Sequence, residues 1–135
     1  MDRVRQMFST HPDPASDAGD EAFALVSAAA ECAYTCTACA DACLAEDDPA
    51  ALRKCIRLNL DCAGICSETA LLIARPGSQD RRVLEAQLQA CATGCRACAE
   101  ECEEHAGHME HCRICAEACR ECERACRQMT NALVA

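Results

Sequence analysis

The chain has 135 residues, which is enough for one domain with a hydrophobic core. Its net charge is −9, and 13 Lys and Arg against 22 Asp and Glu leave no basic patch, which argues against a nucleic-acid partner. Apolar residue types make up 51% of the sequence but aromatic types only 2%, while 16 residues are cysteine. Cysteine and alanine therefore replace much of the usual core material.

The N-terminal segment MDRVRQMFSTHPDP carries charges and prolines where a signal peptide needs an unbroken apolar stretch. We also expect no segment of membrane-spanning length and no membrane partner. These features favour a cytoplasmic protein. Thiols are kept reduced in the cytoplasm, where a cysteine-rich pattern more often indicates metal binding than disulfide bonds.

The first nineteen residues form a short helix and a linker. Residues 1–10 can form a helix with Val4, Met7 and Phe8 on one side, and the following HPDPASDAGD breaks it with prolines, a glycine and aspartates. We therefore divide the chain into an N-terminal short helix with its linker at 1–19 and a helical domain at 20–135.

The helical domain contains four long helices separated by turn signals. Asp48 before Pro49 is typical of a helix start, Arg75-Pro76-Gly77 of a turn, and Ser78 of a helix cap. The predicted helices cover 21–45, 49–74, 78–106 and 109–131. Helices of similar length with short connections predict an all-α fold, an antiparallel up-down-up-down four-helix bundle with a short N-terminal helix.

An internal repeat supports two related helical hairpins. Four cysteines recur 59 residues later: Cys32, Cys36, Cys39 and Cys43 match Cys91, Cys95, Cys98 and Cys102. Three more recur 60 residues later: Cys55, Cys62 and Cys66 match Cys115, Cys122 and Cys126. By this alignment Asn59 stands where the second half has Cys119.

The cysteines follow steps of three and four, which select the helix stripe that normally faces a core. Extending the four stripes in one direction gives ordinary core residues. We call this set the plug and expect it to close one end of the bundle: Leu25, Ile73, Leu84, Leu88, Met129 and Leu133. The rest of the interior is then a column of sulfur.

So many cysteines have three possible explanations, which are core packing, disulfide bonds and metal binding. Buried cysteine can act as a small hydrophobe, but so many would leave a thin core. Disulfides within a helix fit poorly, because Cβ atoms three or four residues apart are about 5–6 Å apart and a disulfide needs about 3.8 Å. Metal fits better: with bonds of about 2.3 Å, two thiolates on opposite sides of one ion lie about 4.6 Å apart, a distance that CxxxC on a helix can reach.

The choice of metal follows from ligand number and softness. Soft thiolates and two- or three-coordinate sites favour Cu(I). Zinc normally takes four ligands from CxxC turns, and the CxxC pairs here are by-products of the helical stripe. The spacing typical of iron–sulfur clusters is absent from the sequence.

Repeated CxxxC pairs on all four helices of a short bundle resemble the cytosolic copper storage proteins. The resemblance covers residues 20–131 and implies Cu(I) bound inside the bundle and a tetramer of bundles. The implied ligands are all sixteen cysteines: Cys32, Cys36, Cys39, Cys43, Cys55, Cys62, Cys66, Cys91, Cys95, Cys98, Cys102, Cys112, Cys115, Cys119, Cys122 and Cys126. Bridging thiolates, each serving two ions, give about 16 Cu(I) per chain. Asn59 departs from the pattern, because an amide is a poor Cu(I) ligand.

The end opposite the plug holds three histidines and a methionine. His105 prolongs the stripe of the third helix and His108 that of the fourth, so we expect these two and Met109 to form a copper uptake site. His111 is interpreted as lying off the stripe, as the weakest member of this site, and His11 as a surface residue.

The sequence favours cytosolic storage and sequestration of many Cu(I) ions. No catalytic acid, base or nucleophile stands apart from the metal pattern, so we expect no enzyme. The alternatives are a copper delivery chaperone, which needs one exposed site, a zinc-binding protein, and a thiol-redox protein, which needs one accessible cysteine of low pKa.

Overall fold

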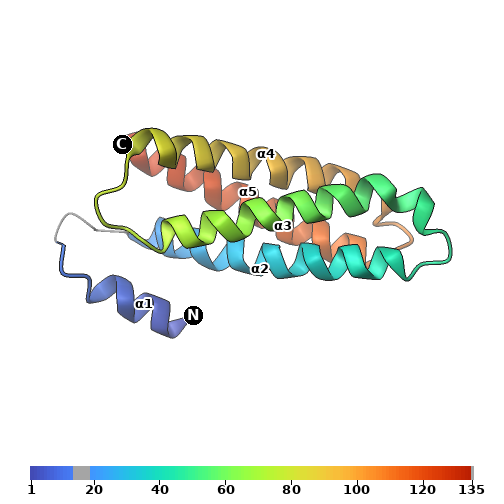
Figure 1. The fold of residues 1–135 in the computed structure, drawn as a ribbon, viewed down its shortest axis with the longest axis horizontal. Coiled ribbons are helices and arrows are strands. Elements are labelled where there is room, and N and C mark those ends of the chain that lie inside the picture. Colours follow the sequence, from blue (N-terminus) through green and yellow to red (C-terminus); the bar gives the residue numbers. More distant parts are fainter. Residues whose placement is uncertain (14–18, 135) are drawn as a thin grey trace.

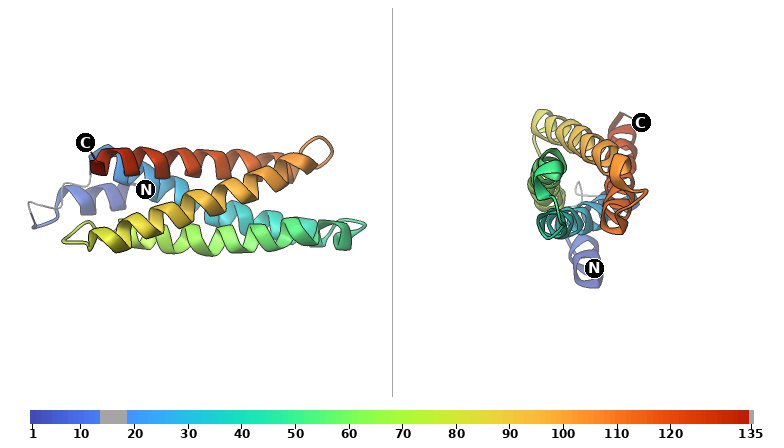
Figure 2. Two further views of the ribbon diagram at one scale, coloured as in Figure 1. Left: turned by 90° about the horizontal axis from the view of Figure 1, so that it is seen from above. Right: turned by 90° about the vertical axis from the view of Figure 1, so that its right-hand side faces the viewer.

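The computed structural model describes residues 1–13 and 19–134, which are helical with no strand among them. The elements are α1 (Asp2–Ser9), α2 (Gly19–Leu44), the 3₁₀ turn η1 (Pro49–Leu52), α3 (Arg53–Ile73), α4 (Arg81–His105) and α5 (Glu110–Val134). Helices α2 to α5 run antiparallel in chain order, and α5 packs back against α2 (Figure 1). Seen end-on, they enclose one interior, with α1 outside (Figure 2). The predicted four-helix bundle with a short N-terminal helix is confirmed.

The helix starts differ from the prediction in two places. Asp48 and Pro49 open a 3₁₀ turn before α3, and the Asp48 side chain makes no capping hydrogen bond. Helix α4 is capped by Asp80, whose carboxylate accepts hydrogen bonds from the backbone N–H groups of Arg82 and Val83, at 2.9 and 3.4 Å. The prediction of Ser78 as the cap was wrong, because the carboxylate two residues later satisfies these N–H groups. Predicted linker residues 14–18 lie outside the described residues.

The plug closes one end of the bundle. Leu25, Ile73, Leu84 and Leu88 are buried, whereas Met129 and Leu133 are partly buried and pack against them. The C-terminus and the α3–α4 connection lie at this end (Figure 1). We call the opposite end, formed by the α2–α3 and α4–α5 connections, the mouth.

Helix α1 packs against the outside of α2 through aromatic contacts. The Phe8 and Phe23 rings meet edge to face with centroids 6.3 Å apart, and the Arg5 guanidinium lies 3.9 Å from the Phe23 centroid. Val4 adds an apolar contact with the core. These contacts attach the N-terminal helix near the plug, away from the mouth (Figure 1).

Helix α2 is more apolar than the sequence analysis allowed. Its 26 residues include a window of mean hydropathy 1.3, so by length and composition it could cross a membrane. The expectation that no segment reaches this length was therefore wrong. The core helix of a bundle passes the same test, and much of the apolar content of α2 is cysteine and alanine that face the interior.

Helices α4 and α5 are joined on the outside by an ion-pair network centred on Glu123. Its carboxylate contacts Arg96 of α4 at 3.1 Å and, on its own helix, Arg120 at 2.9 Å and Arg127 at 2.7 Å. Arg120 also reaches Glu103 of α4 at 2.8 Å. Burial raises the pKa of Glu123, but hydrogen bonds from the three arginines outweigh it and hold the pKa at about 2.

We predict that Glu123→Gln lowers the free energy of unfolding by roughly 1–2 kcal/mol, a modest value because the arginines are partly solvated. The pKa of Glu123 is depressed from 4.5 to about 2, so the stabilisation is complete above pH 4.5 and is lost as the pH falls toward 2. Urea unfolding of the reduced copper-free protein at pH 7 and pH 3 measures both effects.

The matched control is Glu117→Gln. The Glu117 side chain is 68% exposed, and the one ion pair it makes among the described residues is with Arg113, one turn away in α5. This variant should lose less than about 0.5 kcal/mol. Equal losses for the two variants would contradict the role assigned to Glu123.

Candidate metal centre

All sixteen cysteines point into the bundle. Each thiol residue is at most 2% exposed, and each is a free cysteine rather than half of a disulfide. The spacing of three and four residues explains this placement, because it turns every cysteine of a helix toward the same side. Together the sixteen form what we call the thiol column.

Sulfur atoms of different helices touch throughout the column. Cys36 of α2 lies 3.5 Å from Cys119 of α5, and Cys66 of α3 lies 3.5 Å from Cys95 of α4, measured between Sγ atoms. Within α3, Cys62 and Cys66 are 3.7 Å apart, as expected for a CxxxC pair. Such spacings suit thiolates that share a metal ion.

From the plug side to the middle of the bundle, the thiols form four-membered groups that share members. Sulfur atoms within 4.8 Å of one another include these groups: Cys32, Cys66, Cys95 and Cys122; then Cys32, Cys36, Cys62 and Cys119; then Cys36, Cys98, Cys115 and Cys119. Cys32 links the first to the second, and Cys36 and Cys119 link the second to the third. The groups are therefore continuous rather than separate sites.

Toward the mouth the column continues through Cys39. Its sulfur belongs to one group with Cys102 and Cys115, and to another with Cys43, Cys112 and His111, again within 4.8 Å. The group at the mouth includes a nitrogen ligand, the imidazole of His111, as well as thiols. The column thus runs from the plug to a mixed sulfur and imidazole site.

Asn59 faces the column as its repeat position predicts. The residue is fully buried, and its Oδ1 accepts hydrogen bonds from the thiols of Cys98, Cys115 and Cys102 at 3.1, 3.3 and 3.5 Å. Its Nδ2 donates to Cys55 at 3.8 Å. An amide oxygen thus lies where a further thiol would otherwise stand.

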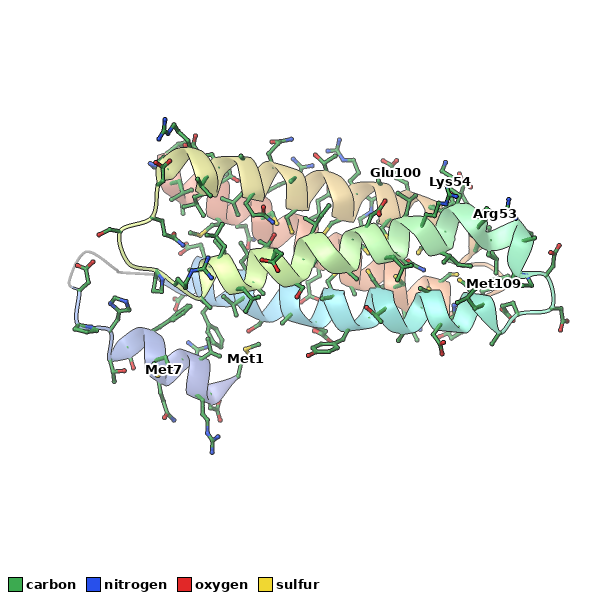
Figure 3. All side chains as sticks on the ribbon, in the orientation of Figure 1. Met1, Met7, Arg53, Lys54, Glu100 and Met109 are labelled. Carbon is green, nitrogen blue, oxygen red and sulfur yellow. The ribbon has the colours of Figure 1, made fainter. Side chains whose placement is uncertain are left out.

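The predicted uptake residues occupy different environments. His105 is half-buried and its Nε2 lies 3.1 Å from Glu101, whereas His108 is exposed, with its ring centroid 6.0 Å from that of His105. Met109 is partly buried against the core. Met109 and Lys54 lie at the mouth end (Figure 3).

His111 takes a larger part in the site than the sequence predicted, which made it the weakest member of the uptake site. Its Nδ1 lies 3.4 Å from the sulfur of Cys39 and 3.7 Å from that of Cys112. The interpretation that it lies off the stripe was wrong, because His111 precedes Cys115 by one helical turn of four residues and therefore shares its side of α5. That spacing is the signal that could have found it.

Cys43 and Cys112, which lie near the mouth, are protonated in the copper-free protein at neutral pH. Burial raises the pKa of Cys43 to about 11 and that of Cys112 to about 12. Binding of a metal ion to a thiolate therefore releases a proton. A monovalent ion that replaces one proton leaves the charge of the column unchanged.

Comparisons with known proteins agree with this arrangement. The family profile described as "Copper storage protein" matches residues 18–131, which span α2 to α5 and all sixteen cysteines. The chain belongs to the copper storage protein family. Helix α1 lies outside the matched range.

Solved structures of copper storage proteins share the fold over most of this chain. The copper storage protein Ccsp from Streptomyces lividans, loaded with 10 copper equivalents, is 47% identical, with a TM-score of 0.87 over 93% of this chain and 96% of that one. A structure of copper loading to a cytosolic copper storage protein of the same organism, with five coppers, is 51% identical, with a TM-score of 0.78 over 82% and 95% of the two chains. A search of the curated proteins found no match.

We predict that the copper-free family member loses stability at alkaline pH. The pKa values of Cys43 and Cys112 are raised above the ordinary 9.0, so their contribution is complete below pH 9 and is lost as the pH rises toward 11–12. The sequence holds one Lys and one Tyr, so thiols dominate the titration in this range. Urea unfolding under reducing conditions at pH 7.5, 9 and 10.5 measures the loss.

The copper-loaded protein is the control, because its thiolates have already lost their protons. Its stability should change little between pH 7.5 and 10.5. A copper-free protein with constant stability over this range would refute the protonation of Cys43 and Cys112.

Proposed function

We propose that this protein stores and sequesters many Cu(I) ions in the cytosol, using the thiol column of the domain at 20–135. One observation carries the proposal: all sixteen thiols are buried and reduced, and groups that share members join most of them into a continuous series of ligand groups. Thiolates are the ligands that Cu(I) prefers. The cytosolic name of the S. lividans relative supports the compartment.

Shared cysteines favour copper over zinc. A structural zinc site takes four ligands of its own, but neighbouring four-thiol groups here use Cys32, Cys36 or Cys119 twice. Those groups cannot all be filled as separate zinc sites. Bridging thiolates between Cu(I) ions use the same geometry without conflict.

Burial argues against the other two alternatives. A delivery chaperone needs an exposed, exchangeable site, and a thiol-redox protein needs an accessible thiolate. Every cysteine here is at most 2% exposed. A storage role without catalysis therefore fits the column best.

Copper uptake is assigned to the mouth. His105, His108 and Met109 lie on this side of the column, and His111 joins the outermost thiols. The plug offers leucine and isoleucine side chains in place of imidazole or thiol ligands, with Met129 as its one thioether. An arriving ion thus meets imidazole before it reaches the inner thiols.

We predict a capacity of about 16 Cu(I) per chain, one per bridging thiolate. Titration of the reduced protein with Cu(I) against a competing chelator measures the capacity, and a pH indicator counts about one released proton per ion. Saturation at one to four ions would refute storage. Preferential binding of Zn(II), at four cysteines per ion, would indicate a zinc protein.

The resemblance to copper storage proteins implies a homotetramer, and we assign an interface to the outer surface of α2 and α3. A groove there has a volume of about 520 Å³ and is lined by uncharged residues, among them the exposed Tyr34, Leu60 and Leu71. Two copies of a chain with a net charge of −9 repel each other elsewhere, so a neutral apolar face favours a second copy as its occupant.

We predict that the double variant Tyr34→Glu with Leu60→Glu lowers the oligomeric mass, because it places like charges in the groove. Light scattering during size-exclusion chromatography measures the mass, with a tetramer expected for the unmodified chain. The control is Leu44→Glu, an equally exposed residue of α2 at the mouth. An unchanged mass in the double variant would refute this interface.

A further inference from the structure

Two histidines at the mouth share one arrangement. The Nε2 atom of His105 lies 3.1 Å from Oε2 of Glu101, and the Nε2 atom of His111 lies 3.3 Å from Oε2 of Glu46. In both rings the nitrogen facing a carboxylate is Nε2. Nδ1 is therefore the atom left for a ligand, and in His111 it already faces the sulfur of Cys39 at 3.4 Å.

Glu101 is held in place more firmly than a surface carboxylate. The residue is 8% exposed, and its second oxygen, Oε1, lies 3.6 Å from Nζ of Lys54 on α3. It precedes His105 by one turn of α4, so the helix itself sets the distance between carboxylate and ring. Lys54 thus pairs with the oxygen that faces away from the imidazole.

Glu46 contacts His111 from the end of the neighbouring helix α2. It follows the C-terminus of α2, where its backbone N–H donates to the carbonyl of Cys43 at 3.2 Å, and its side chain meets His111 near the start of α5. Cys43 belongs to the same ligand group as His111. The carboxylate thus approaches this group from the outside.

We propose that Glu101 and Glu46 are positioning residues for copper uptake. Each accepts the Nε2–H hydrogen bond of its histidine, fixes the ring orientation, and leaves the Nδ1 lone pair directed at an incoming Cu(I) ion. This inference rests on the proposed storage function and on uptake at the mouth.

The chemistry follows from the two ring nitrogens. A neutral imidazole has one N–H and one lone pair, so a carboxylate that accepts the N–H determines which nitrogen can bind metal. The same hydrogen bond makes the ligand nitrogen more basic, and loss of such a partner typically costs 10- to 100-fold in metal affinity or activity. The glutamates themselves do not touch the ion.

The first test needs no copper. Long-range ¹H–¹⁵N spectra of the reduced copper-free protein at pH 8, where imidazole is neutral, report which ring nitrogen carries the proton. We expect the Nε2–H form alone for His105 and His111, with a mixture of tautomers for the exposed His108. An Nδ1–H form at His105 or His111 would overturn the proposal.

The second test is a double-mutant cycle on uptake rate. Cu(I) is presented as its bicinchoninate complex to the unmodified protein, Glu101→Ala, His105→Ala and the double variant. We expect Glu101→Ala to slow uptake about 10-fold. Because Glu101 acts through His105, the double variant should be no slower than His105→Ala alone. The same cycle applies to Glu46 and His111.

Controls separate positioning from a structural role. Glu100→Ala and Asp47→Ala remove exposed carboxylates next to Glu101 and Glu46 and should load at the unmodified rate. Additive slowing in the cycle, or an unmodified rate for Glu101→Ala, would overturn the proposal. A capacity of one to four ions in the unmodified protein would refute storage instead, and the tautomer spectra would still test the hydrogen bonds.

Discussion

The metal centre depends on contact between sulfur atoms in the interior of the bundle. Thiols of neighbouring helices lie 3.5 to 4.0 Å apart, and cysteine is too small to fill the space that leucine fills in an ordinary bundle. The helices can approach closely because buried alanines, including Ala29, Ala63, Ala99 and Ala125, flank the column. These small alanine side chains beside the cysteine stripe therefore let the helices come close enough for thiols of different helices to form ligand groups.

A column made for metal cannot be the main support of the copper-free fold. That support comes from elements that hold no ligand: the leucines and isoleucine of the plug, the aromatic contact of α1 with α2, and the ion pairs around Glu123. The described side chains also leave no buried nitrogen or oxygen atom without a partner. A scaffold that is stable without copper can accept and release ions while its shape is preserved.

The two ends of the bundle differ in chemistry, and this difference gives the column a direction. One end is closed by apolar side chains, and the other carries histidines, glutamates and a partly buried methionine. Burial raises the pKa values of Cys43 and Cys112 near the mouth, so these two thiols are protonated near neutral pH. Histidines that face carboxylates offer nitrogen ligands at the same end of the bundle.

The sequence by itself determined the four helices, the inward stripe, the plug and the repeat of two hairpins. It could do so because the 3.6-residue period sets the direction of each side chain around its own helix axis. The same period would have found His111, which lies one turn before Cys115. The cap of α4 at Asp80 rather than Ser78 was a local competition between two acceptors that spacing did not resolve.

Only the tertiary structure decided which thiols share a group. The spacing along one helix says nothing of how far neighbouring helices slide past one another, and that stagger places Cys32 between two groups and brings Asn59 against Cys98 and Cys115. The pairing of Glu46 with His111 spans 65 positions of sequence and likewise depends on where α2 ends beside α5. The direction of a side chain around its own helix is set by the local sequence, whereas the contacts between helices are set by how the helices pack.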